Sequence, residues 1–182
     1  MLATGGDGPA RLWDADSGTS IATLTGAAGP VWSVAFSPDG TMLATGSDDG
    51  TAGLWDVATR RQIGGPLTAA GPVLSVAFSP DGRMLASGSG SGSGSGDGTV
   101  RLWDVATRRQ IGGPLTAGPV NSVAFSPDGT MLATGGDGTV RLWDVAYLVD
   151  IVPHLCASAR RSPTRTEWTR YAPGTAYRDI CP

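Results

Sequence analysis

Short apolar runs alternate with polar turn sequences along the first 146 residues. Between residues 30 and 67 this alternation predicts four antiparallel strands, over Val31–Phe36, Met42–Gly46, Thr51–Val57 and Gln62–Leu67. The first connection is Ser37-Pro38-Asp39-Gly40, in which the proline presets φ and the glycine tolerates a positive φ. The second contains Asp49-Gly50, a strong local signal for a hairpin turn. Gly64-Gly65 interrupts the fourth run, so that strand is expected to be weak.

The same unit recurs along the chain. Ser-Pro-Asp-Gly begins at Ser37, Ser79 and Ser126, and Leu-Trp-Asp begins at Leu12, Leu54, Leu102 and Leu142. The intervals between successive Leu-Trp-Asp sequences are 42, 48 and 40 residues, a period that is typical of stacked supersecondary units. Because Val31–Phe36 is apolar at nearly every position, its sheet is expected to be packed on both faces by neighbouring sheets.

Composition supports many short strands and narrows the class of partner. The 182 residues are 40% hydrophobic and include 28 glycines, and no apolar run approaches the length of a membrane-spanning helix. No secretory signal follows Met1, so we expect a soluble, cytoplasmic protein that does not bind membranes. Residues 1–146 contain 13 Asp and 8 Arg. This acidic balance disfavours nucleic acid as a partner.

The order of the motifs over residues 1–146 resembles that of the WD-repeat β-propellers. The resemblance implies an all-β fold, an incomplete WD-repeat β-propeller of about three to four four-stranded antiparallel blades, with a short α-helical C-terminal tail. The expected domains are a partial blade at 1–25, a blade at 26–67, a blade with a Gly/Ser insert (88–96) at 68–115, an incomplete blade at 116–146 and the helical tail at 147–182.

Both ends of the repeat region depart from a complete blade. Met1–Gly8 is identical to Met131–Gly138, which is the second strand and hairpin of the last copy. The first unit therefore lacks its first strand, and the last unit lacks a recognisable fourth strand. This leaves fewer full blades than the about four to eight that close a ring. Three explanations stay open: a fragment of a longer protein, association of chains through the open blade edges, or a strained closure with four blades.

The resemblance also implies a polar network that is incomplete in this chain. In WD repeats a His before the first strand bonds with a hairpin Asp, a strand-two Ser or Thr and the Trp. Here that place reads Gly26–Gly29, Ala69–Gly71 and Ala117-Gly118, without His. We therefore expect the tryptophans of the repeats to act mainly through apolar packing, in blades looser than the family norm: Trp55, Trp103 and Trp143.

Gly88–Gly96 is a strict Gly-Ser alternation between the second and third strands of one blade. With no side chains to bury or pair, it is expected to form a mobile loop. A phosphate-binding Gly loop would need a helix N-terminus and usually a following Lys, and the sequence predicts neither at this place.

The C-terminal residues 147–182 differ from the repeats. Apolar positions from Leu148 to Ala159 follow helical spacing, with a start or kink near Pro153. Thr164–Glu167 matches a capping box, so a second short helix is expected there. The tail, from Leu155-Cys156-Ala157 to Cys181-Pro182, resembles that of large actinobacterial WD-repeat signalling proteins. Those proteins resemble fusions of a propeller with a signal-transduction ATPase or a protein kinase.

The sequence predicts no catalytic or cofactor-binding site. The lone His154 and the nearby Cys156 are too few ligands for a metal site, and on a helix they point apart. Cys156 and Cys181 are expected to be thiols in a reducing compartment, although a bridge between them stays open. The aspartates belong to turns and hairpins. We therefore predict no enzyme activity, no metal and no cofactor.

The resemblance implies that a protein or peptide partner docks on the face formed by the loops before strand one and between strands two and three. Carried over by position, the partner-binding residues are Trp32, Leu74 and Asn121. These three differ between copies, whereas Asp56–Ala69 and Asp104–Ala117 are identical. The alternative is that Trp32 and Leu74 simply fill the channel of the propeller.

The predicted function is therefore a non-catalytic scaffold for protein–protein interaction. Two rivals stay open. One is the regulatory sensor end of a larger signal-transduction ATPase or protein kinase, and the other is a structural oligomer that completes a propeller between chains.

Overall fold

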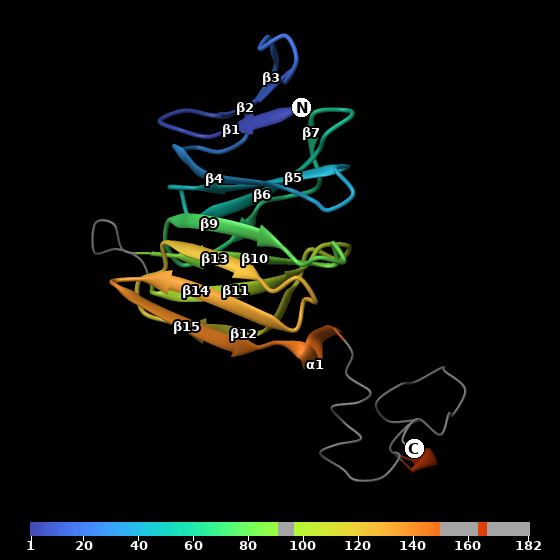
Figure 1. The fold of residues 1–182 in the computed structure, drawn as a ribbon, viewed down its shortest axis with the longest axis vertical. Helices are drawn as coiled ribbons and strands as arrows, with labels where there is room; N and C mark the ends of the chain where they lie inside the picture. Colours follow the sequence, from blue (N-terminus) through green and yellow to red (C-terminus); the bar gives the residue numbers. More distant parts are fainter. Residues whose placement is uncertain (91–96, 150–163, 167–182) are drawn as a thin grey trace. The chain divides into compact units, whose positions relative to one another are not determined.

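The fold is that of a computed structural model, which describes residues 1–90, 97–149 and 164–166. The chain divides into two compact units, Met1–Trp143 and Asp144–Pro182. Antiparallel strands build the first unit (Figure 1). The second unit contains α1 (Ala146–Val149). None of the helices in the described residues is long and apolar enough to cross a membrane.

The strands of the described residues form four sheets. The first sheet contains β1 (Leu2–Thr4), β2 (Ala10–Trp13) and β3 (Ser20–Leu24). The second contains β4 (Val31–Phe36), β5 (Met42–Ser47), β6 (Thr51–Asp56), β7 (Arg61–Gln62) and β8 (Leu67–Thr68). The third contains β9 (Val73–Phe78), β10 (Met84–Ser89), β11 (Thr99–Asp104) and β12 (Gln110–Thr116). The fourth contains β13 (Ser122–Phe125), β14 (Met131–Gly136) and β15 (Thr139–Asp144).

The predicted all-β class and antiparallel pairing are confirmed. One predicted strand, Gln62–Leu67, is wrong as a continuous element. Instead β7 and β8 each pair with β6, and the chain leaves the sheet between them. The break falls at Gly64-Gly65, which have no partner in the ladder, and Gly64 there has a φ of 68°.

Apolar side chains fill the spaces between successive sheets. Ala10, Leu12 and Leu24 of the first sheet pack against Val31, Leu43 and Trp55 of the second. The second and third sheets share a cluster of the same kind, made of residues from both: Ala44, Ala52, Leu54, Leu67, Val73, Val76, Leu85, Trp103 and Val105. The expectation that the sheets pack face to face is therefore confirmed for these two pairs, and this burial is the main source of stability.

The Ser-Pro-Asp-Gly segments form the predicted turns, each with its glycine at positive φ. In the last copy the Ser126 hydroxyl donates to Asp128 Oδ1 and accepts the Met131 N–H at 2.9 Å. The Thr130 N–H also donates to Asp128, at 3.0 Å. The hydrogen bond from Ser126, followed by those from Thr130, lowers the pKa of Asp128 from 3.8 to about 2.

This lowered pKa predicts a dependence of stability on pH. Because the folded-state pKa of Asp128 lies below the unfolded value, the ionised turn stabilises the fold above about pH 4, and this contribution is lost as the pH falls toward about 2. Asp128→Asn should therefore lower the Tm at neutral pH, and the Tm difference from wild type should narrow across that window. Thermal unfolding at a series of pH values measures it, with Asp16→Asn on another loop as the control. A difference that stays constant down to pH 2 would contradict the linkage.

The predicted Gly/Ser insert differs from the structure at its start, and most of the predicted tail lies outside the described residues. Gly88 and Ser89, predicted to begin the mobile insert, are buried at the end of β10, where they pair with Ser75 and Val73. They occupy the places that Gly46 and Ser47 have in β5, so strand pairing continues through them. Residues 91–96 lie outside the described residues. So do His154, Cys156, Cys181 and most of the two predicted tail helices, of which the structure describes α1 and residues 164–166.

Candidate functional site

The first strand of each repeat begins with a buried valine followed by one of the candidate residues. In the second sheet Val31 pairs with Ser47 and Ser33 pairs with Gly46, which leaves Trp32 as an extra residue in the ladder. Leu74 has the same place in the third sheet, where Val73 pairs with Ser89 and Ser75 with Gly88. A β-bulge of this kind redirects the side chain of the extra residue. The bulge is thus the local device that positions Trp32 and Leu74.

Asn121 lies at the corresponding position before β13. Its N–H donates to the Gly135 carbonyl oxygen at 2.8 Å, while the preceding Val120 is buried. The Asn121 side chain is exposed. The third copy therefore repeats the layout of an inward valine followed by the variable residue.

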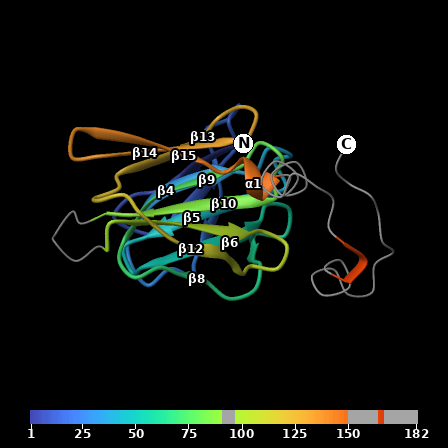
Figure 2. The same ribbon diagram turned by 90° about the horizontal axis from the view of Figure 1, so that it is seen from below.

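Serine side chains join the first strands of neighbouring sheets. The Val76 N–H donates to Ser33 Oγ at 3.1 Å, and the Val123 N–H donates to Ser75 Oγ at 3.1 Å. We call these two hydrogen bonds the serine clasps. They place β4, β9 and β13 side by side, as both views of the fold show (Figure 1, Figure 2).

The clasps also fix the relative register of these strands. Because each clasp begins beside a candidate residue, Trp32, Leu74 and Asn121 lie at the same end of three adjacent strands. The recurring Ser-Val pair was visible in the sequence, yet sequence reasoning gave it no role.

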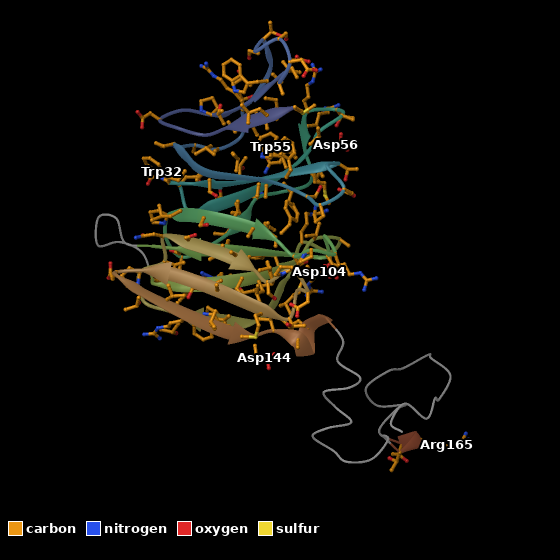
Figure 3. All side chains as sticks on the ribbon, in the orientation of Figure 1. Trp32, Trp55, Asp56, Asp104, Asp144 and Arg165 are labelled. Atoms are coloured by element: carbon orange, nitrogen blue, oxygen red, sulfur yellow. The ribbon has the colours of Figure 1, made fainter. Side chains whose placement is uncertain are left out.

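Trp32 is the most prominent apolar side chain at this end. It is 47% exposed, and its Nε1–H donates to Asp48 Oδ1 at 3.0 Å. Figure 3 shows it on the side of the molecule opposite Asp56 and Asp104. A shallow hollow lies beside this pair, lined by Asp48–Gly50 and Ala69–Pro72. An indole held by one hydrogen bond with much of its ring exposed loses little conformational entropy when a partner covers it.

The loop before β4 is held by Asp49, in the absence of the His expected from the resemblance. Its Oδ2 accepts the Ala28 N–H at 2.7 Å, and its Oδ1 accepts the Thr51 N–H at 2.9 Å and the Thr51 hydroxyl at 2.6 Å. Partial burial raises the pKa of Asp49, but these hydrogen bonds together outweigh it, so the net shift is downward. A backbone amide thus takes one of the bonds that a histidine would make.

Trp55 and Trp103 pack in the apolar clusters between the sheets, as expected, but the repeat tryptophans also make a polar contact that the sequence did not predict. Each indole N–H donates to a hydroxyl on the preceding strand of its own sheet. The bonds run from Trp13 to Thr4 (2.9 Å), Trp55 to Thr45 (3.0 Å), Trp103 to Ser87 (2.8 Å) and Trp143 to Thr134 (3.2 Å). This shorter Trp–hydroxyl pair needs no histidine, because both partners lie on adjacent strands and satisfy each other.

The described residues contain no group of three or more His, Cys, Asp or Glu side chains that could hold a metal ion. Most of the aspartates with lowered pKa values accept hydrogen bonds within their own turns, as Asp56 does from Thr59 and Asp104 from Thr107. These carboxylates stabilise turns.

Comparison with known proteins agrees with this architecture. The chain matches the family described as "WD domain, G-beta repeat" over residues 18–56, 61–104 and 108–144, which is more than half of its length. It is also similar to "Ribosome assembly protein 4" of Chaetomium thermophilum, with 58% identity over 43 residues. That similarity covers 23% of this chain and 8% of the fungal protein. With three matched repeats, strand pairing of blade type and a Trp–hydroxyl bond in every sheet, the chain belongs to the WD-repeat family.

Proposed function

We propose that this protein is a non-catalytic scaffold that binds a protein or peptide partner at the end of the first strands, through Trp32, Leu74 and Asn121. The observation that carries the proposal is the half-exposed, hydrogen-bonded Trp32 at a bulge beside the Asp48–Gly50 hollow. WD repeats in general mediate protein–protein interaction and are generally not catalytic.

Variation between the repeats supports this choice of surface. The residue after the buried valine is Trp, Leu or Asn, whereas the residues that follow it, Ser-Val-Ala-Phe-Ser-Pro-Asp-Gly, are the same in all three copies. The frame that holds the three side chains is thus constant, and their chemistry is not. A mixed aromatic, aliphatic and amide surface suits a peptide, because it offers an apolar anchor beside a hydrogen-bonding group.

The alternative is that Trp32 and Leu74 only fill a channel. The burial of the two side chains differs, so it supports this alternative for Leu74 and not for Trp32. Leu74 is half-buried, as a filling residue would be. Trp32 keeps 47% of its surface exposed, which favours a binding role for that residue. Trp32 is therefore the side chain on which the proposal depends most.

Selection of peptides from a random displayed library against the purified chain tests the proposal. We expect the selected peptides to lose about 30-fold or more in affinity with Trp32→Ala, the effect of removing an aromatic hot spot worth about 2 kcal/mol. Leu74→Ala and Asn121→Ala should give smaller losses. Isothermal titration calorimetry with one synthetic peptide measures all three.

Arg61→Ala is the matched control, because the exposed Arg61 pairs with Asp56, which lies on the side of the molecule opposite Trp32 (Figure 3). It should leave the affinity unchanged. Peptides whose binding ignores Trp32, Leu74 and Asn121 but responds to Arg61 would refute the assignment of this surface.

The finer hypothesis of a regulatory sensor end of a larger signalling ATPase or kinase stays a prediction. The tail sequence on which it depends lies almost wholly outside the described residues. We place the scaffold in the cytoplasm, again as a proposal from the sequence.

A further inference from the structure

The fourth sheet exposes side chains whose counterparts are buried in every other sheet. The strand-three leucines Leu12, Leu54 and Leu102 are buried, whereas Leu142 is 67% exposed. Two residues earlier, Ala10, Ala52 and Val100 are buried, and Val140 is 73% exposed. In the first two sheets these side chains lie on the face that receives the following sheet. Among the described residues, the outer face of β15 is therefore a blade-receiving face on which no sheet lies.

The first sheet exposes the opposite half of the same interface. Leu43, paired with Trp55, packs against the preceding sheet, and Leu85 and Leu132 at the same position are also buried. Leu2, paired with Trp13, has that position in the first sheet and is 55% exposed. Met1 beside it is exposed too.

Glycine and serine positions show the same difference between the fourth sheet and the others. A methyl group on Gly46 would lie 2.8 Å from the Val73 carbonyl oxygen, and one on Gly88 would lie 2.6 Å from Val120 Cγ1. Gly135, at the same position in β14, has nothing within 4 Å. Ser122, which corresponds to Ser33 and Ser75 of the clasps, is exposed. The fourth sheet thus has the Val, Leu, Gly and Ser positions of the interface, and its three described strands have no neighbouring sheet on this face.

We infer that a second copy of this chain covers the Val140–Leu142 face with its own Leu2–Trp13 face, and that the reciprocal contact closes the pair of chains into one ring. Two chains of four sheets each supply eight, which lies within the range of about four to eight blades that propellers use.

A second copy is the partner that these surfaces favour. One chain has the receiving face on its fourth sheet and the matching face on its first sheet. The contact continues the packing already present between its first, second and third sheets. Head-to-tail contacts of this kind form closed rings when the rotation per subunit allows closure. The contact uses sheet faces and not Trp32, so it goes beyond the scaffold function and stands apart from it.

Sedimentation velocity of the full chain over a wide concentration range tests the inference. The expected result is a species of twice the chain mass. Leu142→Asp and Leu2→Asp should each give single chains, with a dissociation constant raised at least 100-fold, because each variant alone has no intact pair of faces. An equimolar mixture of the two variants should associate again, since one intact pair then forms between them.

Arg141→Asp is the control, because its side chain points to the opposite face of β15 from its two neighbours and is exposed. It should stay paired. Far-UV circular dichroism of every variant verifies that the sheets are intact, and peptide binding to Leu142→Asp single chains tests the scaffold proposal separately.

Three outcomes would overturn the inference. One is a single chain at every concentration. Another is a pair that survives Leu2→Asp, which would mean that two β15 faces meet symmetrically. The last is a mass that grows beyond two chains, which would mean an open filament.

Discussion

Leu54→Ala is expected to lower the free energy of unfolding by about 2–5 kcal/mol, the largest loss among the single substitutions considered. Leu54 is buried between the second and third sheets, in one cluster with Val73 and Leu85. Truncation leaves a cavity that strands on both sides hold open, because their backbone is fixed by ladder hydrogen bonds. Urea denaturation followed by circular dichroism measures the loss.

Leu142→Ala provides the internal comparison, since Leu142 has the same place in its copy of Leu-Trp-Asp as Leu54 has in its own. On an exposed side chain the change should stay within about 0.5 kcal/mol. The comparison is made at a concentration at which the chain sediments singly. Equal losses for Leu54→Ala and Leu142→Ala would show that the face of β15 is covered within one chain.

Gly46→Ala is expected to destabilise the fold by about 1–3 kcal/mol. The added methyl group would lie 2.8 Å from both the Val73 carbonyl oxygen and Val73 Cγ1. Because one of these atoms belongs to the backbone of β9, relief requires the second and third sheets to move apart. The same denaturation experiment detects this as a lower midpoint.

At a concentration at which the chain sediments singly, Gly135→Ala should have the opposite sign. No atom lies within 4 Å of the added methyl group, so the smaller entropy of the unfolded chain should stabilise the protein by about 0.4–1 kcal/mol. If both glycine variants lose stability equally, strand geometry and not the neighbouring sheet explains these glycines.

The elements that sequence predicts well here are those determined within a few residues. Val31–Phe36 was expected as a strand and is β4 with the same bounds. The Ser-Pro-Asp-Gly turns follow from the fixed φ of proline and the hydroxyl and carboxylate beside it. Both depend on side chains and backbone close in the chain, so a single sequence contains all the information needed.

Features that depend on a neighbouring sheet were not predictable. The bond from Val76 to Ser33 requires the first strands of two sheets to be adjacent, and no local pattern predicts this adjacency. The candidate residues themselves were found because they vary within a constant frame. Only the structure showed that they lie at the same end of three adjacent strands.

The identical segments Asp56–Ala69 and Asp104–Ala117 form different strands, and a side chain from a neighbouring sheet lies against only one of them. Both pair with the third strand of their sheet in the same register at either end, as Leu67 with Ala52 and Leu115 with Val100. Between the ends, one is broken into β7 and β8, while the other is the continuous β12. The Arg108 guanidinium lies against Gly64, and no atom comes within 4 Å of a methyl group placed on Gly112.

The serine clasp also affects how such a chain can change length over generations. One repeat contributes an acceptor, Ser75, and at the next residue a donor, Val76, and the other two copies have the same Ser-Val pair. When recombination duplicates or deletes one repeat, the new neighbours meet with the same hydroxyl facing the same amide. Gene-level gain and loss of repeats can therefore proceed without any compensating substitution at the junction.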